Sequence, residues 1–146
     1  MKRGPWWAMG AGVLALDQGL KAWVERHLAL GERLPVVPPL LSVTRVHNTG
    51  AAFGLFPQGA AAFLAAAAVA TVLLGAFLLS GRARGLWGWG AALVAAGALG
   101  NLIDRVRLGY VLDFLELPHF PVFNVADAAI VLGAFLLGLG LLRSGR

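Results

Sequence analysis

Long apolar runs separated by short polar segments dominate the chain. Residues 46–81 form an unbroken stretch of 36 positions without Asp, Glu, Lys or Arg. A helix of about 20 residues rises roughly 30 Å, enough to cross the hydrocarbon core of a bilayer. Apolar runs of similar length occur before and after this stretch. We therefore predict one membrane-embedded domain over residues 1–146 with four transmembrane helices, at about 5–24, 59–80, 86–104 and 123–142.

The two longer connections between these helices carry different patterns. Residues 25–58 contain three prolines and then the alternating run Leu41–His47, which predicts a strand in a small extracytoplasmic β-sheet. Residues 105–122 contain the apolar and acidic run Val111–Glu116 (VLDFLE), for which we predict a short interfacial helix. The expected fold class is an all-α membrane protein, a four-helix transmembrane bundle carrying this small sheet and short helix.

Positive charges mark one set of helix ends. No acidic residue occurs among them, whereas all seven acids lie in or near the opposite connections. Because Lys and Arg accumulate in cytoplasmic loops, this asymmetry predicts that both termini and the turn at 81–85 are cytoplasmic. The basic residues concerned are Lys2, Arg3, Arg82, Arg84, Arg143 and Arg146.

Composition agrees with a membrane protein and narrows the possible chemistry. Hydrophobic residues make up 59% of the chain and charged residues 13%, against about 25% charged in soluble domains. The absence of cysteine excludes disulfides, thiolate metal sites and a cysteine nucleophile. Three histidines without metal-ligand spacing give no reason to expect a metal or cofactor. The net charge of +5 is dispersed, which suits an anionic membrane surface better than nucleic acid.

Two polar clusters occur in the first half of the chain. An ionisable side chain in a bilayer costs about 2.5–3.5 kcal/mol, so those present are functional candidates. Asp17 and Lys21 are four residues apart on one helix face, and a self-neutralising structural pair explains them equally well. The segment from Asn48 through Gly50 to Gly54 gathers small residues around an amide, and a simple turn before the next helix is the alternative.

A third cluster lies at the end of the third predicted helix. Helical spacing places Asp104 and Arg105 on the same side as Asn101. Asp104 could simply pair with Arg105 or Arg107. A buried Asn101 amide would need a hydrogen-bond partner, so this residue is the stronger functional candidate.

The fourth cluster contains two aspartates that could meet. Asp113 lies within an apolar run, and Asp127 follows Asn124 by three residues at the start of the last predicted helix. Two adjacent carboxyl groups cannot both ionise, so one would hold a proton while the other acts as a base. The pattern is compatible with acid–base catalysis, but the residues alone do not prefer it to a proton relay or a structural pairing.

Five segments of the chain, read together, resemble the lipoprotein signal peptidase (signal peptidase II) family. All five occur in the family's order, and the resemblance extends from about residue 17 to residue 130. The segments are Asp17–Lys21 (DQGLK), Asn48–Phe53 (NTGAAF), Gly97–Arg105 (GALGNLIDR), Val111–Phe114 (VLDF) and Phe123–Asp127 (FNVAD).

The resemblance implies a bacterial inner-membrane aspartic endopeptidase. Its substrate would be a prolipoprotein, cut just before a diacylglyceryl-modified cysteine, with membrane lipids as the other partners, no nucleic acid, and a monomeric enzyme whose site lies near the extracytoplasmic face. Asp113 and Asp127 match the catalytic pair. The positions that match substrate-binding residues are Asn48, Gly50, Asn101, Arg105, Asn124 and Ala126. Asn124, three residues before Asp127, is placed to orient either that carboxyl group or a substrate carbonyl. Asp17, Lys21 and Asp104 match supporting positions.

Two other classes of function fit the residues alone. A small proton-coupled transporter would also carry intramembrane Asp and Lys, and Asp17 inside the first predicted helix favours that interpretation. A structural assembly subunit would explain the small-residue helices but not the polar clusters. The gathering of Asp104, Asp113 and Asp127 at one face favours the peptidase.

Overall fold

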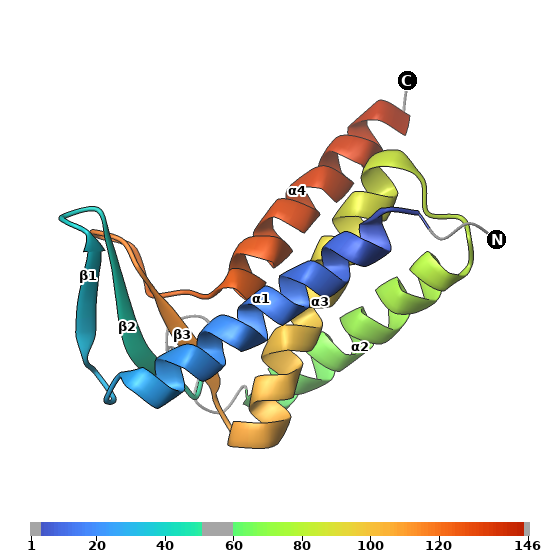
Figure 1. Cartoon of the computed structure of the whole chain (residues 1–146). Helices are drawn as coiled ribbons and strands as arrows, with labels where there is room; N and C mark the ends of the chain where they lie inside the picture. The colour runs from blue at the N-terminus through green and yellow to red at the C-terminus, as the bar shows by residue number, and fades with distance from the viewer. Residues whose placement is uncertain (1–3, 51–59, 145–146) are drawn as a thin grey trace.

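Four helices and a three-stranded antiparallel sheet make up the computed structural model, which describes residues 4–50 and 60–144. Lys2, Arg3, Arg146 and the end of the NTGAAF segment lie outside these ranges. The helices run side by side, and the sheet stands at the end of the bundle where α1 and α3 end and α4 begins (Figure 1). The elements are α1 (Trp6–His27), β1 (Arg33–Val37), β2 (Leu41–Asn48), α2 (Ala60–Leu79), α3 (Gly85–Leu108), β3 (Val111–Glu116) and α4 (Val125–Ser144).

Three of the described helices are long and apolar enough to cross a membrane. These are α2, α3 and α4, with mean hydropathies of 2.5, 1.4 and 2.3. The fourth, α1, is 22 residues long and buries Asp17, Lys21 and Val24. The expectation of a mostly helical membrane protein with a small sheet is thereby confirmed.

Helix α3 is the centre of the bundle because its small residues let other backbones approach. It contacts α1, α2 and α4, whereas α2 contacts no described helix except α3. A Cβ atom on Gly97 would collide with the carbonyl oxygen of Ala126 in α4. Gly90 and Gly133 form a reciprocal contact, since a Cβ on either would lie within 2.8 Å of the other's carbonyl oxygen. Small residues at such crossings are typical of helix packing in membranes.

The sheet has the strand order β1-β2-β3. The strand predicted at Leu41–His47 is confirmed as β2, which pairs with β1 on one side and β3 on the other. In the second pairing, Val46 lies opposite Asp113 and Asn48 opposite Val111. The register therefore brings the end of β2 to the first half of β3.

The prediction of a short helix at Val111–Glu116 is wrong, because these residues form the strand β3. The run pairs with β2 along one edge, and the backbone N–H groups of Phe114 and Leu115 donate to the carbonyl oxygen of Phe123 on the other. Residues 111–114 are all buried. A strand buried on both faces loses the polar–apolar alternation that identifies half-buried strands, so the local pattern did not reveal it.

An apolar cluster fixes β3 against the end of α1. Val24 of α1 and Leu28, directly after this helix, pack with Leu112 and Phe114 of β3. Successive side chains of a strand point to opposite faces. Asp113, between these two anchors, therefore points away from the cluster and toward the start of α4.

Candidate active site

Asn124 connects the two aspartates of the fourth cluster. Its Nδ2 donates to Asp113 Oδ1 at 2.9 Å, and its Oδ1 accepts from the backbone N–H of Asp127 at 2.8 Å. Its own backbone N–H donates to Asp127 Oδ2 at 3.2 Å. This reciprocal pattern is a capping box at the start of α4. One buried amide thus orients a carboxyl group on β3 and another on α4.

Two further asparagines complete the hydrogen bonds of the aspartates. Asn48, at the end of β2, donates from Nδ2 to Asp113 Oδ2 at 3.0 Å. Asn101 of α3 donates from Nδ2 to Asp127 Oδ1 at 2.8 Å. Each of the four carboxyl oxygens therefore accepts one N–H bond, so both carboxyl groups are held in a defined orientation.

Asp113 lies in an environment that favours its protonated form. Its exposed fraction is only 3%. Burial, and next the nearby charge of Asp127, raise the pKa of Asp113 to about 7. The hydrogen bonds from Asn48 and Asn124 oppose this rise only in part. At neutral pH, Asp113 can therefore hold a proton that an ordinary aspartate would have lost.

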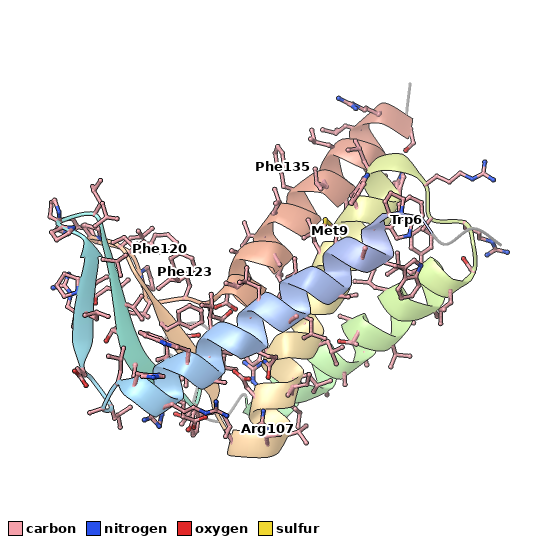
Figure 2. The ribbon with its side chains drawn as sticks, in the orientation of Figure 1. Trp6, Met9, Arg107, Phe120, Phe123 and Phe135 are labelled. Atoms are coloured by element: carbon pink, nitrogen blue, oxygen red, sulfur yellow. The ribbon has the colours of Figure 1, made fainter. Side chains whose placement is uncertain are left out.

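Both aspartates open into a cleft of about 690 Å³ between the sheet and α4. Its apolar part includes Phe120 and Phe123 beyond β3, and Phe135 on α4, which Figure 2 shows on either side of the space between these elements. Val131 is 70% exposed and Phe135 61% exposed on this face of α4. The polar part is formed by Asn48, Gly50, Asn101, Arg105, Asp113 and Asp127.

Arg105 is a cation at this cleft whose charge has no partner among the described residues. It is half-buried, and its guanidinium makes no hydrogen bond or ion pair with any residue in 4–50 or 60–144. A guanidinium presents several donors in a fixed plane, so Arg105 can bind a carbonyl or anionic group that enters the cleft. Within the same ranges, no three His, Asp or Glu residues come together as metal ligands.

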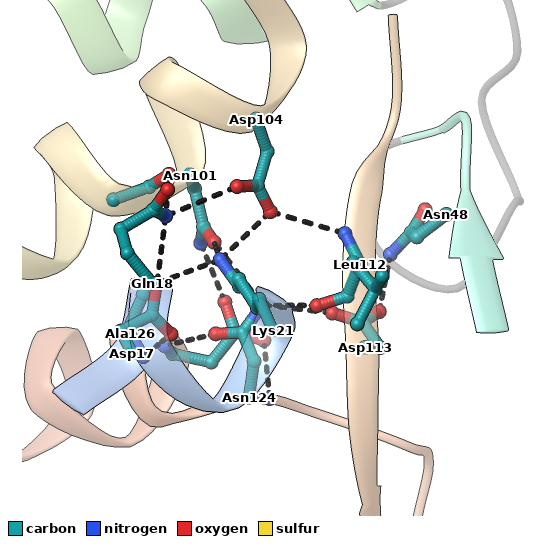
Figure 3. Close-up of polar contacts among 12 residues, drawn as sticks. Asp17, Gln18, Lys21, Asn48, Asn101, Asp104, Leu112, Asp113, Asn124 and Ala126 are labelled. Carbon is teal, nitrogen blue, oxygen red and sulfur yellow. Dashed lines mark hydrogen bonds and ion pairs between the residues drawn. The ribbon is translucent and has the colours of Figure 1, made fainter. Parts of the chain in front are cut away.

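A cluster of buried ion pairs supports the residues that orient the two aspartates. The Lys21 ammonium lies 2.8 Å from Asp17 Oδ2 and 2.8 Å from Asp104 Oδ2, and it donates to Asn101 Oδ1 at 3.2 Å (Figure 3). Asp104 pairs with Lys21 rather than with Arg105 or Arg107. Lys21 therefore joins α1 to the residue of α3 that orients Asp127.

The two carboxylates of this cluster extend it to the other elements. Asp17 Oδ1 accepts the backbone N–H of Ala126 in α4 at 2.8 Å, and Asp104 Oδ2 accepts the backbone N–H of Leu112 in β3 at 3.1 Å. Because Ala126 precedes Asp127 and Leu112 precedes Asp113, the ion cluster holds the backbone beside each aspartate. Asp17 and Lys21 thus contact the framework around the aspartates and do not line the cleft.

Most residues singled out in the sequence meet at this one place, although two of the six that match substrate-binding positions do not line the cleft. Asn124 and Ala126, which match substrate-binding positions, are completely buried at the start of α4. Asn124 bonds to both aspartates and Ala126 gives its N–H to Asp17. These contacts make both residues part of the framework of the site.

Two residues without a predicted role contribute to the framework. Gln18 donates from Nε2 to Asp104 Oδ1 and to the carbonyl oxygen of Gly100, both at 3.1 Å. Tyr110 stacks on His47, with ring centroids 3.8 Å apart, directly beside Asn48. The sequence indicated the role of Gln18 only through its position next to Asp17 in the first cluster. The contact between His47 and Tyr110 depends on the pairing of β2 with β3, so the sequence around either residue does not predict it.

Comparisons with known proteins agree with one another. The profile of a family described as signal peptidase (SPase) II matches residues 9–143. The lipoprotein signal peptidase of Pelotomaculum thermopropionicum is 48% identical over 135 residues, covering 91% of this chain and 88% of that protein. The lipoprotein signal peptidase of Moorella thermoacetica is 45% identical over 126 residues, covering 86% and 84%. A solved structure of a bacterial membrane enzyme is 29% identical with a TM-score of 0.87, covering 95% of this chain and 88% of that one.

Proposed function

Since this chain belongs to the signal peptidase II family, it is an aspartic-type membrane endopeptidase that removes the signal peptides of prolipoproteins, and we propose that Asp113 and Asp127 perform the hydrolysis. One observation carries the proposal. Asn124 holds both carboxyl groups, and both line the same cleft. Because this family consists of peptidases, it replaces the two alternative functions, a proton-coupled transporter and a structural assembly subunit.

The proposed reaction needs one ionised and one protonated aspartate. The ionised carboxylate takes a proton from a water molecule, whose oxygen attacks the carbonyl carbon of the scissile peptide bond. The protonated carboxyl group donates a hydrogen bond to the carbonyl oxygen and then transfers its proton to the leaving amine. The proton taken from water then passes to the acidic partner and restores the pair, so that water supplies all the atoms added across the bond, and no covalent acyl-enzyme forms.

We assign the base to Asp127 and the acid to Asp113. Asp127 lies in the first turn of α4, where the partial positive charge of a helix N-terminus favours an anion. Its partner Asn101 also accepts from the Lys21 ammonium, which polarises the amide toward Asp127. Asp113 lacks a helix terminus, and its pKa of about 7 leaves it substantially protonated at neutral pH.

The assignment predicts a pH effect for Asn48→Ala. The Asn48 hydrogen bond favours the charged form of Asp113, so its loss makes Asp113 hold its proton more tightly. The alkaline limb of kcat/KM, which reports the free enzyme, is expected to move to higher pH by about 0.5–1 unit. Thr49→Ala, at an exposed neighbouring position, is the control. A limb that stays in place or moves to lower pH would count against Asp113 as the acid.

The cleft suits a substrate with both a polar and an apolar part. Arg105, Asn101 and Asn48 offer donors near the aspartates, and the exposed apolar face of α4 continues from there. A signal helix and acyl chains already reside in lipid, so their burial adds only part of the usual hydrophobic gain. We propose that docking of the diacylglyceryl and cysteine region on these donors supplies the selectivity.

We expect a precursor with a diacylglyceryl-modified cysteine to be cut just before that cysteine and much faster than its unmodified form. The comparison uses both peptides in one detergent. Arg105→Gln should slow cleavage of the lipidated precursor about tenfold or more, because a charge-assisted hydrogen bond is lost. Arg107→Gln, an exposed neighbour outside the cleft, should leave the rate unchanged. Equal rates for the two precursors would refute lipid selectivity while leaving the aspartates untouched.

We also propose that α1 spans the membrane with α2, α3 and α4, which gives four transmembrane helices in the bacterial inner membrane. The basic residues at one set of helix ends support an orientation with both termini in the cytoplasm and the sheet with its cleft at the extracytoplasmic face. The enzyme acts as a monomer, because one chain supplies both aspartates and the groups that orient them. Light scattering on the active protein tests the monomer.

Cysteine labelling tests the orientation, since the natural chain has no cysteine. An impermeant thiol reagent added outside intact spheroplasts should label Val36→Cys on the exposed β1. Ser80→Cys, in the exposed turn after α2, should react only after lysis. Labelling of Ser80→Cys in intact spheroplasts would reverse the proposed topology.

A further inference from the structure

A second cavity lies on the side of α3 remote from the aspartates. It has a volume of about 270 Å³ and is lined by residues in 6–14 of α1, 71–78 of α2 and 92–99 of α3. Helices α1 and α2 both pack on α3, yet no described residue of α1 has its Cα within 8 Å of one in α2. Its lining residues therefore define a groove between α1 and α2 with α3 as its floor, and Figure 1 shows how these three helices are arranged.

The interior of this groove is apolar. Its walls include Gly10 and Ala11 on α1 and Gly75 on α2, and the hydroxyl group of Thr71 is satisfied by the carbonyl oxygen of Ala67 at 2.7 Å. A Cβ atom on Gly75 would meet nothing within 4 Å. The groove is thus open space bordered by hydrocarbon. In a bilayer such a space is filled by something equally apolar.

The dimensions of the groove fit one hydrocarbon chain. From Trp6 to Leu14 along α1 it extends about 12 Å, at 1.5 Å per residue. The groove is therefore elongated along α1, as a single extended acyl chain requires. A length of about 12 Å also reaches from the membrane surface into most of one leaflet of the hydrocarbon core.

One end of the groove carries groups that suit a phosphate. Trp6 and Trp7 line this end, and Figure 2 shows Trp6 there, at the start of α1; tryptophan is typical of the headgroup level. Arg82 and Arg84 lie in the turn directly after α2, both exposed. In the part of the chain that the structure describes, neither guanidinium pairs with a carboxylate. Arginine binds phosphate with paired hydrogen bonds.

We propose that this groove binds an anionic phospholipid, with one acyl chain between α1 and α2 and the phosphate at Arg82 and Arg84. The lipid supplies the contact that α1 and α2 do not make directly. It therefore stabilises α2, because only 6% of the residues in the spanning segment of this helix are buried by protein. The site is separate from the cleft that holds the aspartates, so it stands whether or not these prove catalytic.

Native mass spectrometry of the full-length protein tests the proposal. The probes are dioleoyl phosphatidylglycerol, which is anionic, and dioleoyl phosphatidylcholine, which has the same chains without net charge. We expect one tightly retained phosphatidylglycerol, preferred about tenfold over phosphatidylcholine and raising the unfolding temperature. Arg82→Gln with Arg84→Gln should abolish the preference.

Two variants that fill the groove complete the test. Gly75→Leu on α2, and Ala11→Leu on α1 as an alternative should the first fail to fold, are expected to displace the retained lipid. Gly12→Leu is the matched control, because Gly12 is exposed on α1 outside the groove and a Cβ there also meets nothing.

Three outcomes would overturn the proposal. Unchanged lipid retention in both groove-filling variants would mean that the retained lipid belongs to the nonspecific shell of lipid around the protein and not to the groove. Equal retention of the two phospholipids by the natural chain would remove the role of the arginines. A dimer that Gly75→Leu dissociates would show that a second copy of the chain occupies the groove.

Discussion

Replacing either Asp113 or Asp127 by Asn is expected to lower single-turnover cleavage of a lipidated prolipoprotein by about a thousandfold or more. Each change removes one member of an acid–base pair and substitutes a group of the same shape that neither takes nor gives the required proton. The Asn124 and Asn101 contacts can adapt to an amide, so the variants should stay folded. The double variant should be little slower than either single one, because residues that act as a unit are not additive.

Glu116→Gln is the matched control for this experiment. Glu116 lies on β3, three residues after Asp113, and pairs at the surface with Arg33 at 3.1 Å. Its isosteric change should leave cleavage within about twofold, because a surface ion pair contributes little. If either aspartate variant keeps a tenth of the natural rate while Glu116→Gln is normal, that aspartate does not act in catalysis.

Replacing Lys21 by Met is expected to lower the free energy of unfolding by about 3–5 kcal/mol. The change leaves Asp17 and Asp104 buried without their common counterion. Cleavage should fall as well, because Asn101 loses the ammonium that fixes its amide. Equilibrium unfolding in mixed micelles gives the free energy, and the cleavage assay gives the second effect.

Arg26→Met and a double variant sharpen this test. Arg26 is an exposed residue near the end of the same helix, so its change should cost less than about 0.5 kcal/mol. Adding Asp104→Asn to Lys21→Met should recover part of the lost stability, since one of the two unpaired charges is then removed. A Lys21→Met protein as stable as Arg26→Met would show that the ion cluster does not support the fold.

The parts of the fold that depend on local pattern were predictable from the sequence. Apolar runs long enough to cross a bilayer marked the positions of the helices, and alternation at Leu41–His47 marked β2. The aspartates were identified because a bilayer makes ionisable side chains rare and costly. These signals need only the residues of the segment itself.

The parts that depend on tertiary pairing could not be read in this way. Val111–Glu116 lies between β2 and Phe123 and is buried on both sides. Its residues therefore lack the alternation of polar and apolar side chains that would have identified a strand. The partner of Asp104 lies 83 positions earlier, at Lys21, and nearby arginines were the natural candidates. Asn124 was expected to orient either Asp127 or a substrate carbonyl, and the sequence could not decide between them, because it cannot show that the start of α4 is enclosed by β3 and α1.

The hydrogen bond from Ala126 to Asp17 joins residues 109 positions apart. It brings the first helix to the beginning of the last one, beside Asp127. During synthesis the first three helices can enter the membrane while this contact is still missing. The two aspartates therefore gain their final geometry only when the last helix has been inserted, and with the roles proposed for them a nascent chain is expected to be inert toward the prolipoproteins around it.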